Sequence, residues 1–134
     1  MAKESGLGLT VTVDDHLGAP KDISNDISSI DFSTPRGVTD ITGLDKSGAE
    51  RLLLIADGQV TINGWFNDAS GLSHDVFKTV PSTSVTRTVT IAISGQTLAM
   101  EMLLLDYAVS RASNGELTWT VPAQLADGTV PTWA

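Results

Sequence analysis

Apolar and polar residues alternate with a period of two over several stretches of this chain, and this pattern restricts the fold more than any other feature. The stretches are Leu7–Val13, Gln59–Asn67, Val85–Ile93 and Glu116–Val121. Successive side chains of a β-strand point to opposite faces, so this period is typical of strands with one buried face. Val85–Ile93 is also rich in valine and threonine, which have a high β-propensity. The sequence therefore predicts a chain built mainly of strands.

Tight turns join three of the predicted strands in series. Ser94-Gly95-Gln96 connects Val85–Ile93 to a long, largely apolar strand, Thr97–Val109. Ser113-Asn114-Gly115 then connects that strand to Glu116–Val121. Glycine and asparagine accept the backbone conformations of two- and three-residue hairpin turns. The three strands are therefore expected to form an antiparallel meander.

Two segments have the features of helices. Asp45 is a suitable N-cap residue, Ala49–Ala56 is rich in helix formers, and Asp57-Gly58 follows as a terminator. This is the strongest helix that the sequence predicts. A second, shorter helix is predicted over Ser70–Val80, where Pro81 ends it.

The chain before the first predicted helix is expected to change its conformation twice. Asp22–Ser28 is interpreted as a short helical or irregular turn that passes into a strand over Ser29–Ser33. Thr34-Pro35-Arg36-Gly37 then breaks the strand, because Pro35 has no N–H for a ladder and Gly37 frees the backbone. A polar loop is expected from there to about Leu44.

No repeat, low-complexity tract or linker divides the 134 residues, so we expect a single domain over residues 1–134. The elements predict a mainly β fold, either a β-sandwich or a rolled antiparallel sheet with one flanking α-helix. The tail at about residues 123–134 is too short for a packed element of its own and is expected to be an extended C-terminal arm. Val130 and Trp133 are apolar, so we expect this arm to dock on its own sheet or on a neighbouring subunit.

Composition excludes several classes of function. The chain has no cysteine, which removes disulfides, thiolate chemistry and Cys-ligated metal sites. Its formal net charge is −8, and its eight lysines and arginines are spread singly, so we expect no specific binding to nucleic acid. The apolar content is too high for disorder and too interrupted for a membrane span. The N-terminus, Met1–Gly6, lacks a signal-peptide pattern and is interpreted as a mature cytoplasmic start.

The side chains that could act in catalysis or bind a metal do not form a recognisable motif in the sequence. His16 and His74 have no metal-ligand spacing, and no serine lies in a hydrolase elbow, so no catalytic residue, metal or cofactor is predicted. Glu101 lies within an apolar run of the strand Thr97–Val109, where burial would require a partner such as Arg87 across the hairpin. The favoured interpretation is that it lies on a sheet face covered by another subunit or by a helix. The three tryptophans leave sugar binding as a minor alternative to burial in a core or subunit contact.

Two parts of the sequence resemble the small major tail proteins that form the tail tube of long-tailed bacteriophages. The first runs from Ile23 to Asp68 and includes Phe32-Ser33-Thr34-Pro35-Arg36, Asp40-Ile41-Thr42-Gly43-Leu44 and Val60-Thr61-Ile62-Asn63-Gly64-Trp65-Phe66. The second is the closing stretch, Gly115–Pro122 and Asp127–Trp133.

The resemblance implies a tail-tube β-sandwich with a flanking helix and a non-enzymatic, structural function. Such proteins form rings, typically hexameric, that stack into the DNA conduit of the tail. The partners implied are further copies of the chain and other phage tail proteins, while DNA passes without specific binding. The location implied is the virion tail, after synthesis and assembly in the host cytoplasm.

Three features of the sequence agree with assembly into a tube. Long strands with few protective edge charges favour pairing with the strands of neighbouring subunits. The strand from Leu98 to Leu105 is apolar on both faces, so both faces require cover. An acidic lumen would repel the phosphates of DNA. The residues predicted to take part in assembly are Pro35, Arg36, Gly37, Glu101, Val130 and Trp133. The loop over Thr34–Leu44 is expected to reach the next ring. Two alternatives remain, a tail-completion or terminator protein that forms a single ring, and a virion decoration or receptor-binding β-module.

Overall fold

The computed structural model describes residues 5–134, so the predicted N-terminal start lies in part outside the described residues. Its strands are β1 (Thr10–Asp14), β2 (Pro20–Asp22), β3 (Ile27–Ser33), β4 (Arg36–Asp40), β5 (Arg51–Ala56), β6 (Gln59–Trp65), β7 (Arg87–Ile93), β8 (Gln96–Leu104), β9 (Ala108–Arg111) and β10 (Leu117–Leu125). A 3₁₀-helix, η1 (Ser24–Asp26), precedes β3, and α1 (Ser73–Phe77) lies between β6 and β7.

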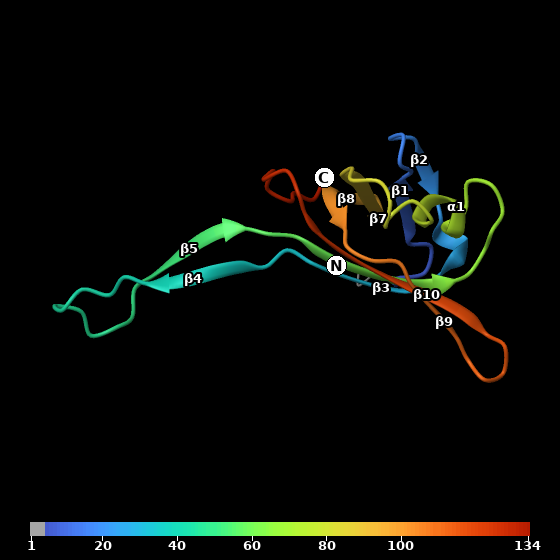
Figure 1. The fold of residues 1–134 in the computed structure, drawn as a ribbon. Helices are drawn as coiled ribbons and strands as arrows, with labels where there is room; N and C mark the ends of the chain where they lie inside the picture. Colours follow the sequence, from blue (N-terminus) through green and yellow to red (C-terminus); the bar gives the residue numbers. More distant parts are fainter. Residues whose placement is uncertain (1–4) are drawn as a thin grey trace.

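The main sheet is antiparallel and has the order β2-β1-β7-β8-β10-β6-β3, with β9 paired to β10. It folds over so that its two halves face each other, and α1 lies at one end of the space between them (Figure 1). The predicted fold class, a β-sandwich or rolled antiparallel sheet with one flanking helix, is confirmed. The flanking helix is the shorter of the two predicted helices.

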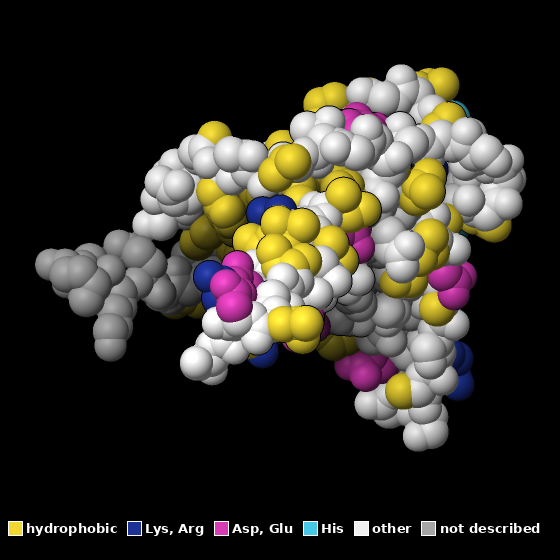
Figure 2. Space-filling model, turned by 90° about the vertical axis from the view of Figure 1, so that its left-hand side faces the viewer, with side chains coloured by type: hydrophobic (Ala, Val, Ile, Leu, Met, Phe, Trp, Pro, Cys, Tyr) yellow, Lys and Arg dark blue, Asp and Glu magenta, His cyan; other side chains and the backbone are white. Residues whose placement is uncertain are grey.

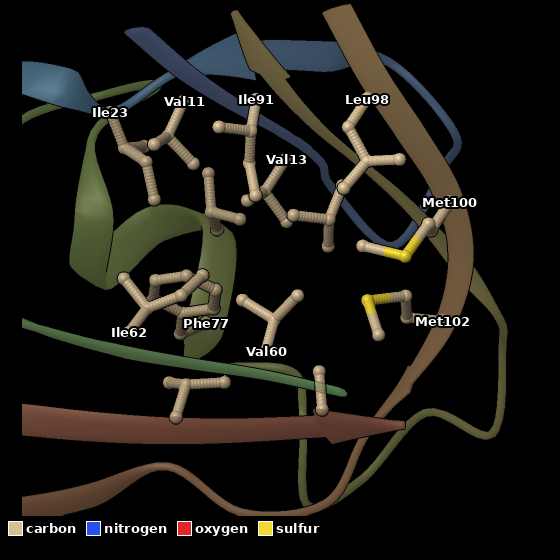
Figure 3. Close-up of a cluster of buried hydrophobic side chains, with 14 of the residues drawn as sticks. Val11, Val13, Ile23, Val60, Ile62, Phe77, Ile91, Leu98, Met100 and Met102 are labelled. Atoms are coloured by element: carbon tan, nitrogen blue, oxygen red, sulfur yellow. The ribbon is translucent and has the colours of Figure 1, made fainter. Parts of the chain in front are cut away.

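The core fills the space between the two halves of the sheet. Leu98, Met100 and Met102 of β8 point toward Val60 and Ile62 of β6 (Figure 3). Phe77 of α1 closes one end of this core and packs against Trp119, with 5.0 Å between their ring centroids. The alternation that predicts the strands therefore also identifies their buried faces.

The close packing of η1 on β6 depends on Gly64. A Cβ at this position would lie 2.2 Å from the carbonyl oxygen of Asp26 and 2.5 Å from the Trp119 ring. The buried Asp26 carboxylate accepts hydrogen bonds from the Ser73 backbone N–H and the Asn67 side chain, each 3.0 Å long. These bonds join η1 to the start of α1.

The predicted helix over Ala49–Ala56 is wrong, because this segment contains β5, which pairs with β4. An uninterrupted apolar run is compatible with either a helix or a strand, and here a non-local partner decides. That partner lies within the predicted loop Thr34–Leu44, which is therefore not a simple loop. Together β4 and β5 form a two-stranded hairpin that projects from the sheet on the side opposite α1 (Figure 1), and we call residues 36–56 the arm.

The predicted strand Thr97–Val109 is interrupted. β8 ends at Leu104 and β9 begins at Ala108, because β10 pairs with β8 over Ala123–Leu125 and with β9 over Leu117–Thr120. Ala123–Leu125, which begins the predicted C-terminal arm, lies within β10. No helix among residues 5–134 is long and apolar enough to cross a membrane.

Candidate assembly surfaces

The two histidines considered as candidate metal ligands, His16 and His74, lie at positions typical of structural residues. Within residues 5–134, no group of three or more acidic or histidine side chains is placed to hold a metal ion. His74 packs on Phe66, with 4.5 Å between ring centroids, and its Nδ1 lies 3.1 Å from the Tyr107 hydroxyl. Burial raises the pKa of Tyr107, so this hydroxyl stays protonated at neutral pH. His16 lies in the turn between β1 and β2.

Glu101 does not pair with Arg87, although this pairing is one of the alternatives considered for it. Glu101 lies on the outward face of β8 and accepts a hydrogen bond from the Thr88 hydroxyl, with 2.6 Å between the oxygens. Arg87 points to the opposite face, where its buried guanidinium donates to the Val76 carbonyl oxygen and to the Thr79 hydroxyl. Arg87 therefore fixes the end of α1 to the sheet.

The predicted assembly residues Pro35, Arg36 and Gly37 lie at the base of the arm, with Pro35 directly before it. The Pro35 carbonyl oxygen accepts a hydrogen bond from the Asp57 N–H at 3.0 Å. Gly37 faces Leu54, because a Cβ there would lie 3.2 Å from that side chain. Pro35 therefore holds the start of the arm against the chain that follows β5, whereas Arg36 and Gly37 begin β4 and lie against β5.

The apolar side chains of the arm are exposed. Leu52, Leu53, Leu54 and Ile55 are between 43% and 87% exposed, and Leu44 at the tip is fully exposed. In the view from the side where the arm projects, hydrophobic side chains gather near the centre with charged groups beside them (Figure 2). So many exposed apolar side chains on one element are unusual for a subunit that remains alone.

A second uncovered apolar surface lies where β8 ends. Leu103 and Leu105 are about half exposed, and with Val80 and Val85 they line a shallow hollow of about 350 Å³. The inner face of β8 is covered by the core, whereas its outer face remains open at this end. Contacts within one subunit therefore leave this apolar surface uncovered, as expected for a strand that is apolar on both faces.

The C-terminal residues dock on the sheet of their own chain. Ala134 and Thr97 exchange two backbone hydrogen bonds of 2.8 Å each, and Trp133 forms an isolated antiparallel β-bridge with Leu98. The rings of Trp133 and Phe32 have centroids 6.0 Å apart. Trp133 is still 43% exposed and Val130 is 62% exposed, so both retain apolar surface for a further contact.

The main sheet has open edges. Among the described residues, β2, β3 and β9 each pair with a strand on one side only. Their free N–H and C=O groups can pair with strands of another chain. β3 is the longest of these edges, with seven residues.

The outward face formed by β3, β6 and β10 is polar apart from the exposed Trp65, and it lacks positive charge. The Thr120 hydroxyl donates to Asn63 Oδ1 at 2.8 Å, and Asn63 Nδ2 donates to the Ser29 hydroxyl at 3.1 Å. These bonds form a ladder across the three strands. The strands contain no lysine or arginine, and Asp31 is their only charged residue.

Comparison with known proteins identifies the fold. No protein-family model and no curated protein sequence matches the chain. A chain from the tail of an empty gene transfer agent particle, solved with C6 symmetry, has a TM-score of 0.78 and 16% identity, over 98% of both chains. A chain from the virion of a native gene transfer agent particle has a TM-score of 0.77 and 16% identity, over 97% of this chain and 99% of that one. The resemblance to tail proteins is therefore confirmed at the level of the fold.

Proposed function

We propose that this chain is the major tail tube subunit of a phage-like tail, in which hexameric rings stack into a DNA conduit. The observation that carries the proposal is the match, over nearly the whole length of both chains, to a chain from a C6-symmetric tail. The uncovered surfaces of the subunit support it independently. The proposal includes a location in the virion tail, assembly in the host cytoplasm, and contacts with other tail proteins at the ends of the tube.

The arm supports contact between rings. It projects beyond the body and carries exposed apolar residues, whereas the hollow lined by Leu103 and Leu105 lies on a different part of the chain. Contacts between two different surfaces are heterologous and generate rings or open filaments instead of closed dimers. This arrangement favours a tube that grows by repeated addition.

The open sheet edges support contact within a ring. β3 and β9 present unpaired backbone groups along their outer sides. Pairing between the edge of one subunit and the edge of its neighbour satisfies these groups and continues the sheet around the ring. Glu101 on the outward face of β8 is proposed to lie near such a contact, together with Val130 and Trp133.

The polar face of β3, β6 and β10 supports passage of DNA. Hydroxyl and amide groups keep this face hydrated, and the absence of lysine and arginine leaves nothing to hold phosphates. The formal charge of −8 repels them further. We propose that this face lines the conduit, so that DNA moves through without specific binding.

Electron microscopy of the purified protein, without added cofactor, tests the proposal. We expect rings or tubes with a central channel. A single ring that does not stack favours a terminator protein, and a monomer or trimer favours a decoration or receptor-binding module. A strictly monomeric species at high protein concentration, across salt conditions, contradicts the proposal.

A further inference from the structure

The arm has apolar side chains on both of its faces. Leu52 pairs with Thr39 and Leu53 pairs with Val38, which fixes the residues that share a face. Face A carries Ile41, Leu52 and Leu54, and face B carries Val38 and Leu53. All five side chains are exposed, so the subunit itself covers neither face.

A two-stranded sheet that exposes two apolar faces to solvent is energetically unfavourable. An isolated hairpin is marginally stable, and independent stability requires packing against other elements. A strand that is apolar at every position, as β5 is from Leu52 to Ala56, is typical of a strand buried on both sides. A single surface laid against the arm covers one face and leaves the other in solvent, so the arm requires two covering surfaces.

The charge of the arm fits a partner that is another copy of this chain. The arm contains three of the eight basic residues and three of the sixteen acidic residues, so it is formally neutral. The rest of the chain therefore carries the whole formal charge of −8. A neutral arm can approach the acidic body of another copy without the repulsion that two bodies exert on each other.

We propose that each arm is clamped between two other copies of this chain, with one copy against face A and a different copy against face B. This inference rests on the proposed function and adds the partners of the arm. In stacked rings, the arm enters the junction between two adjacent subunits of the next ring. A lone subunit offers no such junction, so stacking requires a neighbouring ring that is already formed.

Site-specific crosslinking tests the proposal cleanly because the chain has no cysteine. Leu52→Cys places a thiol on face A and Leu53→Cys places one on face B, and each is labelled with benzophenone maleimide. Leu17→Cys, at an exposed leucine in the turn between β1 and β2, is the control. A small fraction of tagged, labelled copies is assembled with a large excess of unlabelled wild-type protein and irradiated, so that each adduct contains one labelled arm.

We expect each single arm variant to give tagged dimers and the doubly labelled Leu52→Cys/Leu53→Cys variant to give tagged trimers. The control is expected to give a much lower yield. If electron microscopy shows tubes but the double variant gives only dimers, the proposal of a clamped arm is overturned. The proposal that the chain is a tube subunit is then unaffected. Equal yields from the control and the arm variants also overturn the clamped arm, and the absence of any assembly overturns both proposals.

A second pair of variants tests the two faces without a label. Leu52→Ser/Leu54→Ser removes apolar surface from face A, and Val38→Ser/Leu53→Ser removes it from face B. We expect both variants to keep the thermal unfolding midpoint of the wild-type subunit and to lose tube formation to a similar extent. Normal tubes from either variant show that its face is not covered, which overturns the proposal.

Discussion

The guanidinium of Arg36 donates two hydrogen bonds to the carbonyl oxygen of Leu54, with 2.9 Å from Nε and 2.7 Å from Nη2. These residues lie on opposite strands of the arm, near its base. Their contact replaces part of the regular ladder, which shifts register between Arg36 and Val38. Arg36 therefore stabilises the arm at the position where its pairing is irregular.

Replacing Arg36 is expected to loosen the arm without unfolding the body. Arg36→Ala removes both hydrogen bonds, which together contribute about 1 kcal/mol or less at an exposed site. We expect faster amide hydrogen exchange at Val38 and Leu53, fewer tubes, and an unchanged unfolding midpoint. Arg36→Lys keeps the charge but not the two-point contact and is expected to be intermediate. Unchanged exchange in both variants would show that this contact does not hold the arm.

Arg87 is expected to stabilise the body through its contacts with the end of α1. Arg87→Ala leaves the Val76 carbonyl without this donor and creates a cavity in place of a buried side chain. The expected loss in the free energy of unfolding is about 2–4 kcal/mol, measured by urea denaturation. Arg87→Met keeps most of the volume and should lose less. Equal stability of the alanine variant and the wild type would contradict this role.

Gly64 is expected to tolerate no side chain. Gly64→Ala forces a methyl group against Asp26 and Trp119, so η1 or the ring must move, at a cost of about 1–3 kcal/mol. Gly48→Ala is the matched control, because nothing lies within 4 Å of a Cβ at that position. Thermal unfolding of both variants measures the difference. A similar midpoint for the two would refute the close packing.

Removing the C-terminal segment is expected to weaken the sheet. Truncation after Ala126 eliminates the backbone hydrogen bonds between Ala134 and Thr97 and the cover that Trp133 gives to Phe32. We expect a lower unfolding midpoint and poorer assembly, and a milder form of both defects for Trp133→Ala. If the truncated protein unfolds and assembles as the full chain does, the docked segment contributes to neither property.

Acid is expected to destabilise the turn between β1 and β2. Hydrogen bonds from the backbone N–H groups of Ala19 and Leu17 hold the pKa of Asp15 below its usual value. Because the folded pKa is lowered, the stabilisation is present above the unfolded pKa of about 4 and is lost as the pH falls through the folded pKa. The decline in unfolding free energy below pH 4 should be smaller in Asp15→Asn. An identical decline would exclude Asp15 as a contributor.

The sequence by itself determined most of the main sheet. Alternation predicts strands that match β1, β6, β7 and β10, because side chains on a pleated strand must divide between core and solvent whatever their partner is. Local chemistry also identifies the turn at Ser94-Gly95, where both residues have positive φ. The resemblance to tail proteins came from the same segments.

Only the tertiary structure decided the conformation of the arm and the contacts of its predicted assembly residues. Arg51–Ala56 has the composition of a helix and of a doubly buried strand, and pairing with Arg36–Asp40 selects the strand. Likewise, Arg87 and Glu101 belong to the same hairpin, yet the pleat sends them to opposite faces. Local propensity acts over a few residues, whereas pairing and packing join residues far apart in the chain, and such contacts cannot be read from either segment alone.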